Sequence, residues 1–363
     1  MKTLVTGRET MTSKERVQAF FRGEKTDRVP INMSWNPLIQ QRVMDYFEAE
    51  NYWELRQALG VDFAGVWAPY NGPALFEPIP DRNIDPLTGT RTRWVEHGSG
   101  GYWDFCDFPL EHATVDEVAA WPFAAPDDFD YSPIEAEVDE YPEMAFHAGH
   151  PGMACIINTC GFLRSMEQVF VDLITDDEAG LLLMDKLMEM QYGHMKRILE
   201  AGNGKIDFMW MGEDLGTQIA PLISIDLFRK HIRPRQQPFY DLAKEHGIPR
   251  LLHTCGSSSW AYEDYIEMGL TGADTLQPEA TNMSPEYLKK TFGGRLVFHG
   301  AISSTGPLTF GTPDDVEADC RKTLDIMMDG GGYAFAPTHC LQDNTPTENA
   351  IRMYETVHQH GWY

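Results

Sequence analysis

Short apolar runs alternate with longer amphipathic segments along most of the chain. The runs predict buried strands at 29–33, 61–68, 154–158, 208–211, 250–253, 273–276, 296–299 and 333–336. Most are followed by a stretch with apolar residues at helical spacing, of which 178–200 is the longest. Such alternation is typical of a parallel sheet covered by helices. We therefore expect an α/β protein.

The number of predicted strands narrows the architecture. About eight strands within 363 residues suit a single (β/α)8 TIM barrel domain that spans 1–363. A doubly wound open sheet is the alternative. It is disfavoured because neither a glycine-rich dinucleotide loop nor a phosphate-loop lysine motif follows any of the apolar runs.

Two sequence patterns predict where helices begin. Thr12 and Glu15 form a capping-box pattern ahead of an apolar helical stripe, and Thr345 and Glu348 repeat the pattern near the C-terminus. By contrast, residues 70–145 break the strand–helix rhythm. They are rich in proline and contain a hairpin-like stretch at 90–105 with a glycine-rich tip at 98–101. We expect this segment to be an insertion in the barrel.

Charge and cysteine content restrict the class of protein. The chain has 29 Lys+Arg against 55 Asp+Glu, a formal net charge of −26. This balance disfavours nucleic acid and anionic membrane surfaces as partners, and no apolar stretch is long enough to cross a bilayer. Much of the acid lies in the run 127–143. Six scattered cysteines show no disulfide-framework spacing, so we expect a cytoplasmic protein with a small-molecule substrate, and a homodimer remains open.

Polar residues gather where the predicted strands end. In a TIM barrel the carboxyl ends of the strands build the active site. The residues at these ends are Asn32, Trp35, Glu213, Asp214, Gln218, His253, Cys255, Gln277, His299, His339 and Cys340. If these ends face one barrel mouth, the side chains converge there.

The most specific chemistry is a metal pair. His253 and Cys255 alternate at a strand end and therefore point the same way, and imidazole with thiolate suits zinc. A third ligand could come from His339 or Cys340. The alternative is a buried, hydrogen-bonded histidine beside a core cysteine.

The remaining strand-end residues have both a chemical and a structural interpretation. Glu213 and Asp214 would complete the metal shell or act as general acid and base, unless they cap a helix. His299 would contact substrate or satisfy a loop. We assign substrate binding to Trp35, Asn32, Gln218 and Gln277, although tryptophans at strand ends are also ordinary core residues.

Several short motifs, in order, resemble the uroporphyrinogen decarboxylase-like superfamily. They are residues 11–17, 27–30, 213–218, 253–256 and 337–349. The resemblance covers nearly the whole chain and implies a (β/α)8 barrel. Decarboxylases of this superfamily carry an arginine-rich segment after the first strand. Here residues 32–38 hold no arginine, which speaks against a porphyrinogen substrate.

The other branch of the superfamily comprises corrinoid-dependent methyltransferases. Its coenzyme M enzymes bind zinc through a His-x-Cys pair and a later cysteine. His253 and Cys255 match the pair, whereas the later cysteine falls on His339, with Cys340 one place on. A histidine at this place is also what the decarboxylases have.

The resemblance therefore implies a zinc-assisted methyltransferase or demethylase. It would move a methyl group between a small methylated donor or thiol acceptor and methylcobalamin, or another corrinoid, carried by a separate corrinoid protein. One alternative is a metal-free carboxy-lyase acting on a small carboxylate through Asp214 and His339. Another is a non-catalytic binding barrel.

Overall fold

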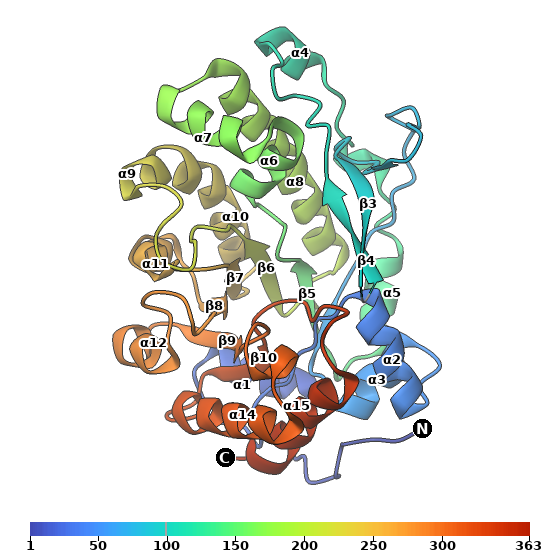
Figure 1. Cartoon of the computed structure of the whole chain (residues 1–363), viewed down its shortest axis with the longest axis vertical. Helices are drawn as coiled ribbons and strands as arrows, with labels where there is room; N and C mark the ends of the chain where they lie inside the picture. The colour runs from blue at the N-terminus through green and yellow to red at the C-terminus, as the bar shows by residue number, and fades with distance from the viewer. Residues whose placement is uncertain (99) are drawn as a thin grey trace.

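The computed structural model describes residues 1–98 and 100–363. In this part of the chain, seven parallel strands form one curled sheet in the order β1-β5-β6-β7-β8-β9-β10 (Figure 1). The strands are β1 (Phe63–Gly65), β5 (Ala145–Gly149), β6 (Phe208–Gly212), β7 (Arg250–Thr254), β8 (Gly272–Thr275), β9 (Val297–Ile302) and β10 (Tyr333–Pro337). The sheet confirms the expected α/β class, and its curl is TIM-barrel-like.

The predicted first strand at 29–33 is reduced to one bridge. Ile31 pairs in parallel with Phe335 of β10, and the Asn32 amide donates to the Phe335 carbonyl at 2.9 Å. On the other side, the Asp62 amide donates to the Ile31 carbonyl at 2.8 Å. The segment therefore lies between β10 and β1, the two end strands of the sheet.

Helices surround this sheet (Figure 1). They are α1 (Ser13–Phe21), α2 (Pro37–Phe47), α3 (Tyr52–Leu59), α6 (Ile156–Arg164), α7 (Met166–Thr175), α8 (Glu178–Ala201), α9 (Ile225–Leu227), α10 (Arg233–Glu245), α11 (Tyr262–Met268), α12 (Pro285–Phe292), α13 (Pro307–Phe310), α14 (Pro313–Met327) and α15 (Thr347–His360). A π-helical turn, η2 (Phe228–Ile232), joins α9 to α10, and a 3-10 turn, η3 (Ser259–Ala261), precedes α11. None of the helices described is long and apolar enough to span a membrane.

Helix α1 closes the amino-terminal end of the sheet. Its start is the predicted capping box, because Thr12 accepts from the Glu15 amide and Glu15 accepts from the Thr12 amide. Val17 and Phe20 then pack in one apolar cluster with Phe63 and other residues near the beginnings of the strands. Because these buried apolar side chains fill the end at which the strands begin, the carboxyl ends of the strands form the open end of the sheet.

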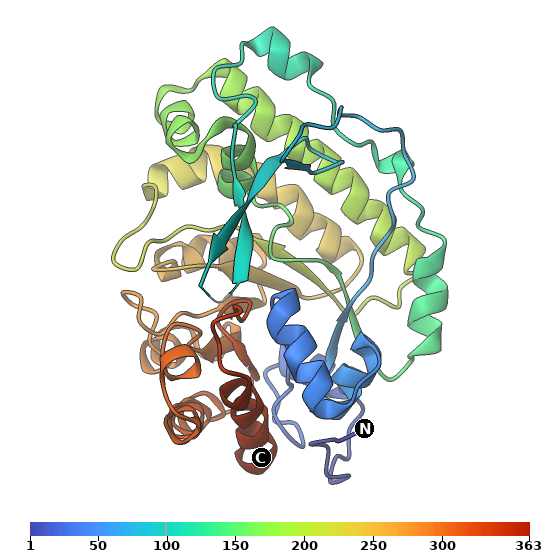
Figure 2. The ribbon, with the colours of Figure 1, turned by 45° about the vertical axis from the view of Figure 1, so that its right-hand side comes forward.

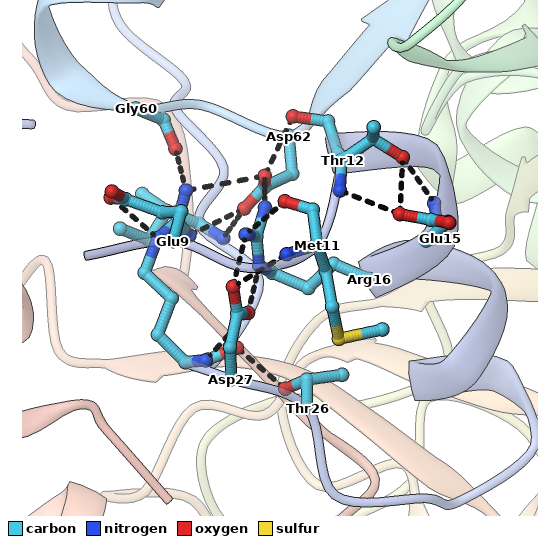
Figure 3. Close-up of polar contacts among 12 residues, drawn as sticks. Glu9, Met11, Thr12, Glu15, Arg16, Thr26, Asp27, Gly60 and Asp62 are labelled. Carbon is cyan, nitrogen blue, oxygen red and sulfur yellow. Dashed lines mark hydrogen bonds and ion pairs between the residues drawn. The ribbon is translucent and has the colours of Figure 1, made fainter. Parts of the chain in front are cut away.

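A buried ion cluster fastens α1 to the strands (Figure 3). Arg16 pairs with Asp27 at 2.7 Å and with Asp62 at 2.6 Å, and Arg28 pairs with Asp62 at 2.7 Å. Burial opposes ionisation of Asp62, but the Arg28 and Arg16 guanidinium groups outweigh it and lower the pKa of that carboxyl. The Asp62 carboxylate also accepts the Ile31 amide. Two of the motifs that carry the family resemblance, 11–17 and 27–30, thus supply structural residues.

Two sequence predictions are wrong. Residues 154–158 do not form a strand but lead into α6, and the strand of this region is β5, which pairs with β1. A short apolar run has no periodicity that separates a buried strand from the first turn of a buried helix. Likewise, Thr345 and Glu348 form no capping box. Helix α15 begins after Pro346 and has no side-chain cap.

The segment 70–145 lies between two strands that pair directly, β1 and β5. It contains β2 (Asn83–Ile84), β3 (Arg91–His97), β4 (Gly100–Phe105), α4 (Val115–Ala120), η1 (Pro126–Asp128) and α5 (Pro133–Glu140). The strands β3 and β4 pair antiparallel as the predicted hairpin. The predicted glycine-rich tip, 98–101, includes residue 99, which lies outside the described residues.

The hairpin crosses the open end of the sheet (Figure 2). Near its base, the Phe105 ring stacks on Phe162 of α6 with centroids 3.6 Å apart. At the other end, His97 Nε2 lies 3.6 Å from Asp343 Oδ2, in the loop that follows β10. Because α6 and this loop both follow carboxyl ends of strands, the hairpin spans the end at which the candidate site residues lie.

Candidate metal centre

Strand register places three polar side chains in one row. His253 of β7 pairs with Asp274 of β8, and Asp274 pairs with His299 of β9. Residues paired across neighbouring strands point to the same side of a sheet. Consequently, His253 Nδ1 lies 2.8 Å from Asp274 Oδ2, and His299 Nδ1 lies 2.6 Å from Asp274 Oδ1.

Asp274 is the centre of this network. Besides the two imidazoles, its carboxylate accepts the Trp210 indole N–H at 3.2 Å and the Thr275 amide at 2.6 Å. Although the group is buried, His299 and His253 hold the pKa of Asp274 well below its usual range. A buried ionised carboxylate with donors on both oxygens holds its neighbours in fixed orientations.

The hydrogen bonds of His299 define its tautomer. The Asn32 side-chain oxygen accepts the Met33 amide, so the Asn32 amide nitrogen faces His299 Nε2 at 3.0 Å and donates to it. Nε2 is therefore an acceptor, and Nδ1 carries the proton donated to Asp274. His299 and Asn32, expected to be catalytic and substrate-binding, are both buried and bonded to each other.

Three side chains form a cluster with metal-ligand geometry. One ligand atom each of His253, Cys255 and His339 lies within 4.8 Å of the others, and Cys255 Sγ is 3.5 Å from His253 Nε2. The His253 side chain is only 12% exposed. Since Asp274 engages Nδ1, the His253 Nε2 atom is the one that faces the thiol.

Electrostatics differ among the three members of this cluster. Burial favours neutral His253, but its hydrogen bonds to Asp274 and Cys255 raise its pKa well above the ordinary value. Burial raises the pKa of Cys255, against the effect of His253. Burial also lowers the pKa of His339. The bonds to Asp274 and Cys255 thus favour the protonated form of His253, whereas burial favours the neutral forms of Cys255 and His339.

Two of the predicted polar residues hold the loop that carries Cys255. Asp214 Oδ1 accepts the Cys255 amide at 2.9 Å, and Gln277 Oε1 accepts the Gly256 amide at 2.6 Å. Gly256 has φ +69°, and a Cβ there would lie 2.1 Å from the Gly216 carbonyl oxygen. Glycine is therefore required for this close approach.

Glu213 is not among the clustered side chains. Its fully buried carboxylate accepts the Ile156 amide at 2.8 Å and the Ile157 amide at 3.0 Å, at the start of α6. Gln236 donates to it from α10. Burial raises the pKa of Glu213 to about 8, against the effect of the two amides. This is the helix-capping alternative that the sequence left open.

The other expected site residues are not among the three clustered side chains. Trp35 is buried with its ring 5.4 Å from Tyr354. Gln218 is exposed, and its carbonyl accepts the Thr281 amide. Cys340 directs its thiol at the Leu341 carbonyl. The structure thus places His339, rather than Cys340, beside His253 and Cys255.

Sequence reasoning missed Asp274 and Thr275. A signal was present, because Asp274 is a charged residue inside the apolar run 273–276. Thr275 has φ +85°, an unfavourable value for a β-branched residue, and its hydroxyl lies 2.8 Å from His253 Nδ1. Strained backbone of this kind occurs where surrounding structure holds a functional geometry.

Comparisons with known proteins find relatives of two kinds. A uroporphyrinogen decarboxylase of Legionella pneumophila (strain Philadelphia 1) is 24% identical over 222 residues, 61% of this chain and 59% of that protein. The methylcobamide:CoM methyltransferase MtbA of Methanosarcina mazei is 25% identical over 190 residues, 51% of each protein. The aligned parts thus span about half to three-fifths of these relatives.

Structural comparison supports the same fold over a greater length. A solved methyltransferase from Methanosarcina mazei superposes with a TM-score of 0.62 at 20% identity, covering 96% of this chain and 98% of that one. The sequence profile described as uroporphyrinogen decarboxylase (URO-D) matches residues 134–360, more than half of the chain. The chain therefore belongs to the uroporphyrinogen decarboxylase (URO-D) family.

Proposed function

We propose that this protein is a zinc-dependent methyltransferase that exchanges a methyl group with a corrinoid carried on a separate protein. The observation that carries the proposal is the cluster of His253, Cys255 and His339, whose ligand atoms lie within 4.8 Å of one another at the open end of the sheet. Relatives named as methylcobamide:CoM methyltransferases support the reaction class.

The donor set suits zinc. Two imidazoles and one thiolate with an open fourth position match the pattern of catalytic zinc sites. The 3.5 Å separation of Cys255 Sγ and His253 Nε2 agrees with two ligands bound to one tetrahedral ion at about 2.0–2.3 Å. Asp274 supplies the carboxylate that commonly orients a zinc-binding histidine.

The chain's own residues prepare this site for a cation. The Asp274 carboxylate accepts a hydrogen bond from His253 Nδ1 and so directs Nε2 toward Cys255 as the ligand atom. Asp214 holds the backbone of Cys255 in place. Bound zinc would supply Lewis-acid activation of a thiol sulfur or an ether oxygen. The hairpin β3–β4, which spans this end, would restrict the access of water to a small substrate.

The methyl carrier would come from outside the chain. We infer a corrinoid protein that docks over the open end, in a cytoplasmic enzyme that could also form a homodimer. The segment 32–38 has no arginine for a porphyrin polycarboxylate, which favours a small methylated donor or a thiol acceptor. The assay below determines whether the methyl group moves to the corrinoid or from it.

The test combines metal analysis with turnover. Protein purified without chelator should contain about one zinc per chain. It should either demethylate methylcobalamin in the presence of a small thiol or methylate a reduced corrinoid protein in the presence of a small methylated donor, and either reaction changes the visible spectrum of the corrinoid. Cys255→Ser should lose zinc and activity. Cys320→Ser is the matched control, because Cys320 is a buried cysteine of α14 and is not a candidate metal ligand. This variant should keep its zinc and its activity.

Other outcomes select the alternatives. Zinc-free protein that releases CO2 from a small carboxylate would identify a carboxy-lyase that uses Asp214 and His339. Protein that binds a ligand without any turnover would identify a non-catalytic barrel. Either result contradicts the proposal.

A further inference from the structure

A cavity lies apart from the residues of the candidate metal centre. Its volume is about 570 Å³, and residues after β1 and β5, helices α6 and α8 and the hairpin line it. Its apolar wall includes Trp67, Phe105, Phe129, Phe162, Met153 and Met190. None of His253, Cys255 and His339 lines it. Its volume falls within the range of about 300–1,000 Å³ that is usual for small-molecule sites.

One buried polar side chain lines this cavity with an unused donor. Gln191 of α8 is only 8% exposed, and its Oε1 accepts the Ala154 amide at 2.7 Å. That bond fixes the amide orientation, so Nε2 is the remaining group. Within the described part of the chain, Gln191 Nε2 has no hydrogen-bond partner. A donor that lines a cavity and has no protein partner is available to a ligand or to water.

Two histidines add one further donor and one acceptor. His150 Nδ1 accepts the Gly152 amide at 3.0 Å, so the neutral ring carries its proton on Nε2. Tyr131 donates its hydroxyl to the Pro126 carbonyl, which leaves its oxygen to accept from His194 Nδ1 at 2.9 Å. His194 Nε2 is therefore an acceptor. Neither Nε2 atom is paired with another described residue.

The cavity carries almost no charge. Burial lowers the pKa of His150 and lowers that of His194 to about 4, so both rings are neutral at pH 7. Lysine and arginine are absent from the described lining, and its one acid, Asp85, uses Oδ1 to hold the turn at Leu87 and Thr88. An anionic ligand would lose its hydration without gaining a cation.

We infer that this cavity binds a neutral aromatic compound that carries an oxygen acceptor, with the ring between the aromatic walls and the oxygen on Gln191 Nε2. Flat rings pack against Trp, Phe and Met side chains in offset or edge-on geometry. The inference does not rest on the proposed methyltransferase reaction, because the cavity and the metal cluster share no residue.

Calorimetric titration of the full chain tests the inference, with 2-naphthol and 2-naphthalenesulfonate as probes. Both have the same ring system, but the second is an anion. We expect 2-naphthol to bind at least about tenfold more tightly, since the cavity offers donors and no cation. Equal or tighter binding of the sulfonate would overturn the inference.

Variants locate the binding. Gln191→Glu keeps an acceptor for the Ala154 amide but removes the donor, and should weaken 2-naphthol at least about tenfold. Met190→Trp places a larger side chain in the cavity and should abolish 2-naphthol binding. This variant tests the site independently if Gln191→Glu folds poorly. Glu189→Gln, an exposed neighbour on α8, is the matched control and should bind as the wild type does.

A further variant separates this cavity from the metal centre. Cys255→Ser, which tests the proposed zinc site, should leave the affinity for 2-naphthol unchanged. Loss of binding in Cys255→Ser, or unchanged binding in Met190→Trp, would place the probe elsewhere and refute the inference.

Discussion

Replacing Asp274 by asparagine tests how the candidate metal centre is organised. The Asp274 carboxylate accepts four hydrogen bonds, from His253, His299, Trp210 and the Thr275 amide. An asparagine side chain has one oxygen and one NH2 group. The two donors that bind one of the carboxylate oxygens would therefore face the NH2 group, which is itself a donor. If the NH2 faces His253, Nδ1 must become the acceptor, and the proton then moves to Nε2, the atom that faces Cys255.

The expected effect is on metal affinity. Loss of such an orienting carboxylate lowers zinc affinity by about 10- to 100-fold, equivalent to about 1.4–2.8 kcal/mol. Competition with a chromophoric chelator at pH 7.5 measures the dissociation constant directly. Asp27→Asn, a variant of the buried ion cluster at the opposite end of the sheet, controls for lost stability and should bind zinc normally. Asp274→Asn protein with wild-type zinc affinity would refute the reasoning.

Two further predictions concern stability. Asp62→Asn leaves the buried guanidinium groups of Arg16 and Arg28 short of a partner, so urea unfolding should show a loss of about 3–5 kcal/mol. The exposed Glu24→Gln variant should cost less than about 1 kcal/mol, and equal losses would contradict this account. Burial lowers the pKa of His147 from 6.5 to about 3. Because the unfolded chain then binds more protons, stability should fall as the pH drops below 6.5, by about 2 kcal/mol at pH 5 from this residue. His147→Gln should flatten the pH dependence, and an unchanged slope would refute the assignment.

Part of the fold could be predicted from the sequence because it depends on local chemistry. The alternation of apolar runs with helical stripes indicated a parallel α/β sheet, and Thr12 with Glu15 indicated the start of α1. The prediction failed at 154–158, where a buried helix start has the same composition as a buried strand. It also failed at Thr345, because α15 begins after Pro346 without a side-chain cap.

The candidate site was predictable only in outline. A histidine and a cysteine two residues apart at a strand end identified His253 and Cys255 as a pair, because side chains alternate along a strand. The sequence left open whether His339 or Cys340 joins them, and whether Glu213 belongs to the site or caps a helix. It gave Asp274 no role, although the charge inside an apolar run was visible.

Tertiary structure decided these points. Parallel register set His253, Asp274 and His299 in one row, and the path of the chain after β10 brought His339 to the pair. Glu213 turned instead to the amides at the start of α6. Local alternation determines which way a side chain points along its own strand. Which side chains meet depends on the register between strands that are distant in sequence and on which buried donors need an acceptor. The register and the buried donors are defined only when the sheet is assembled.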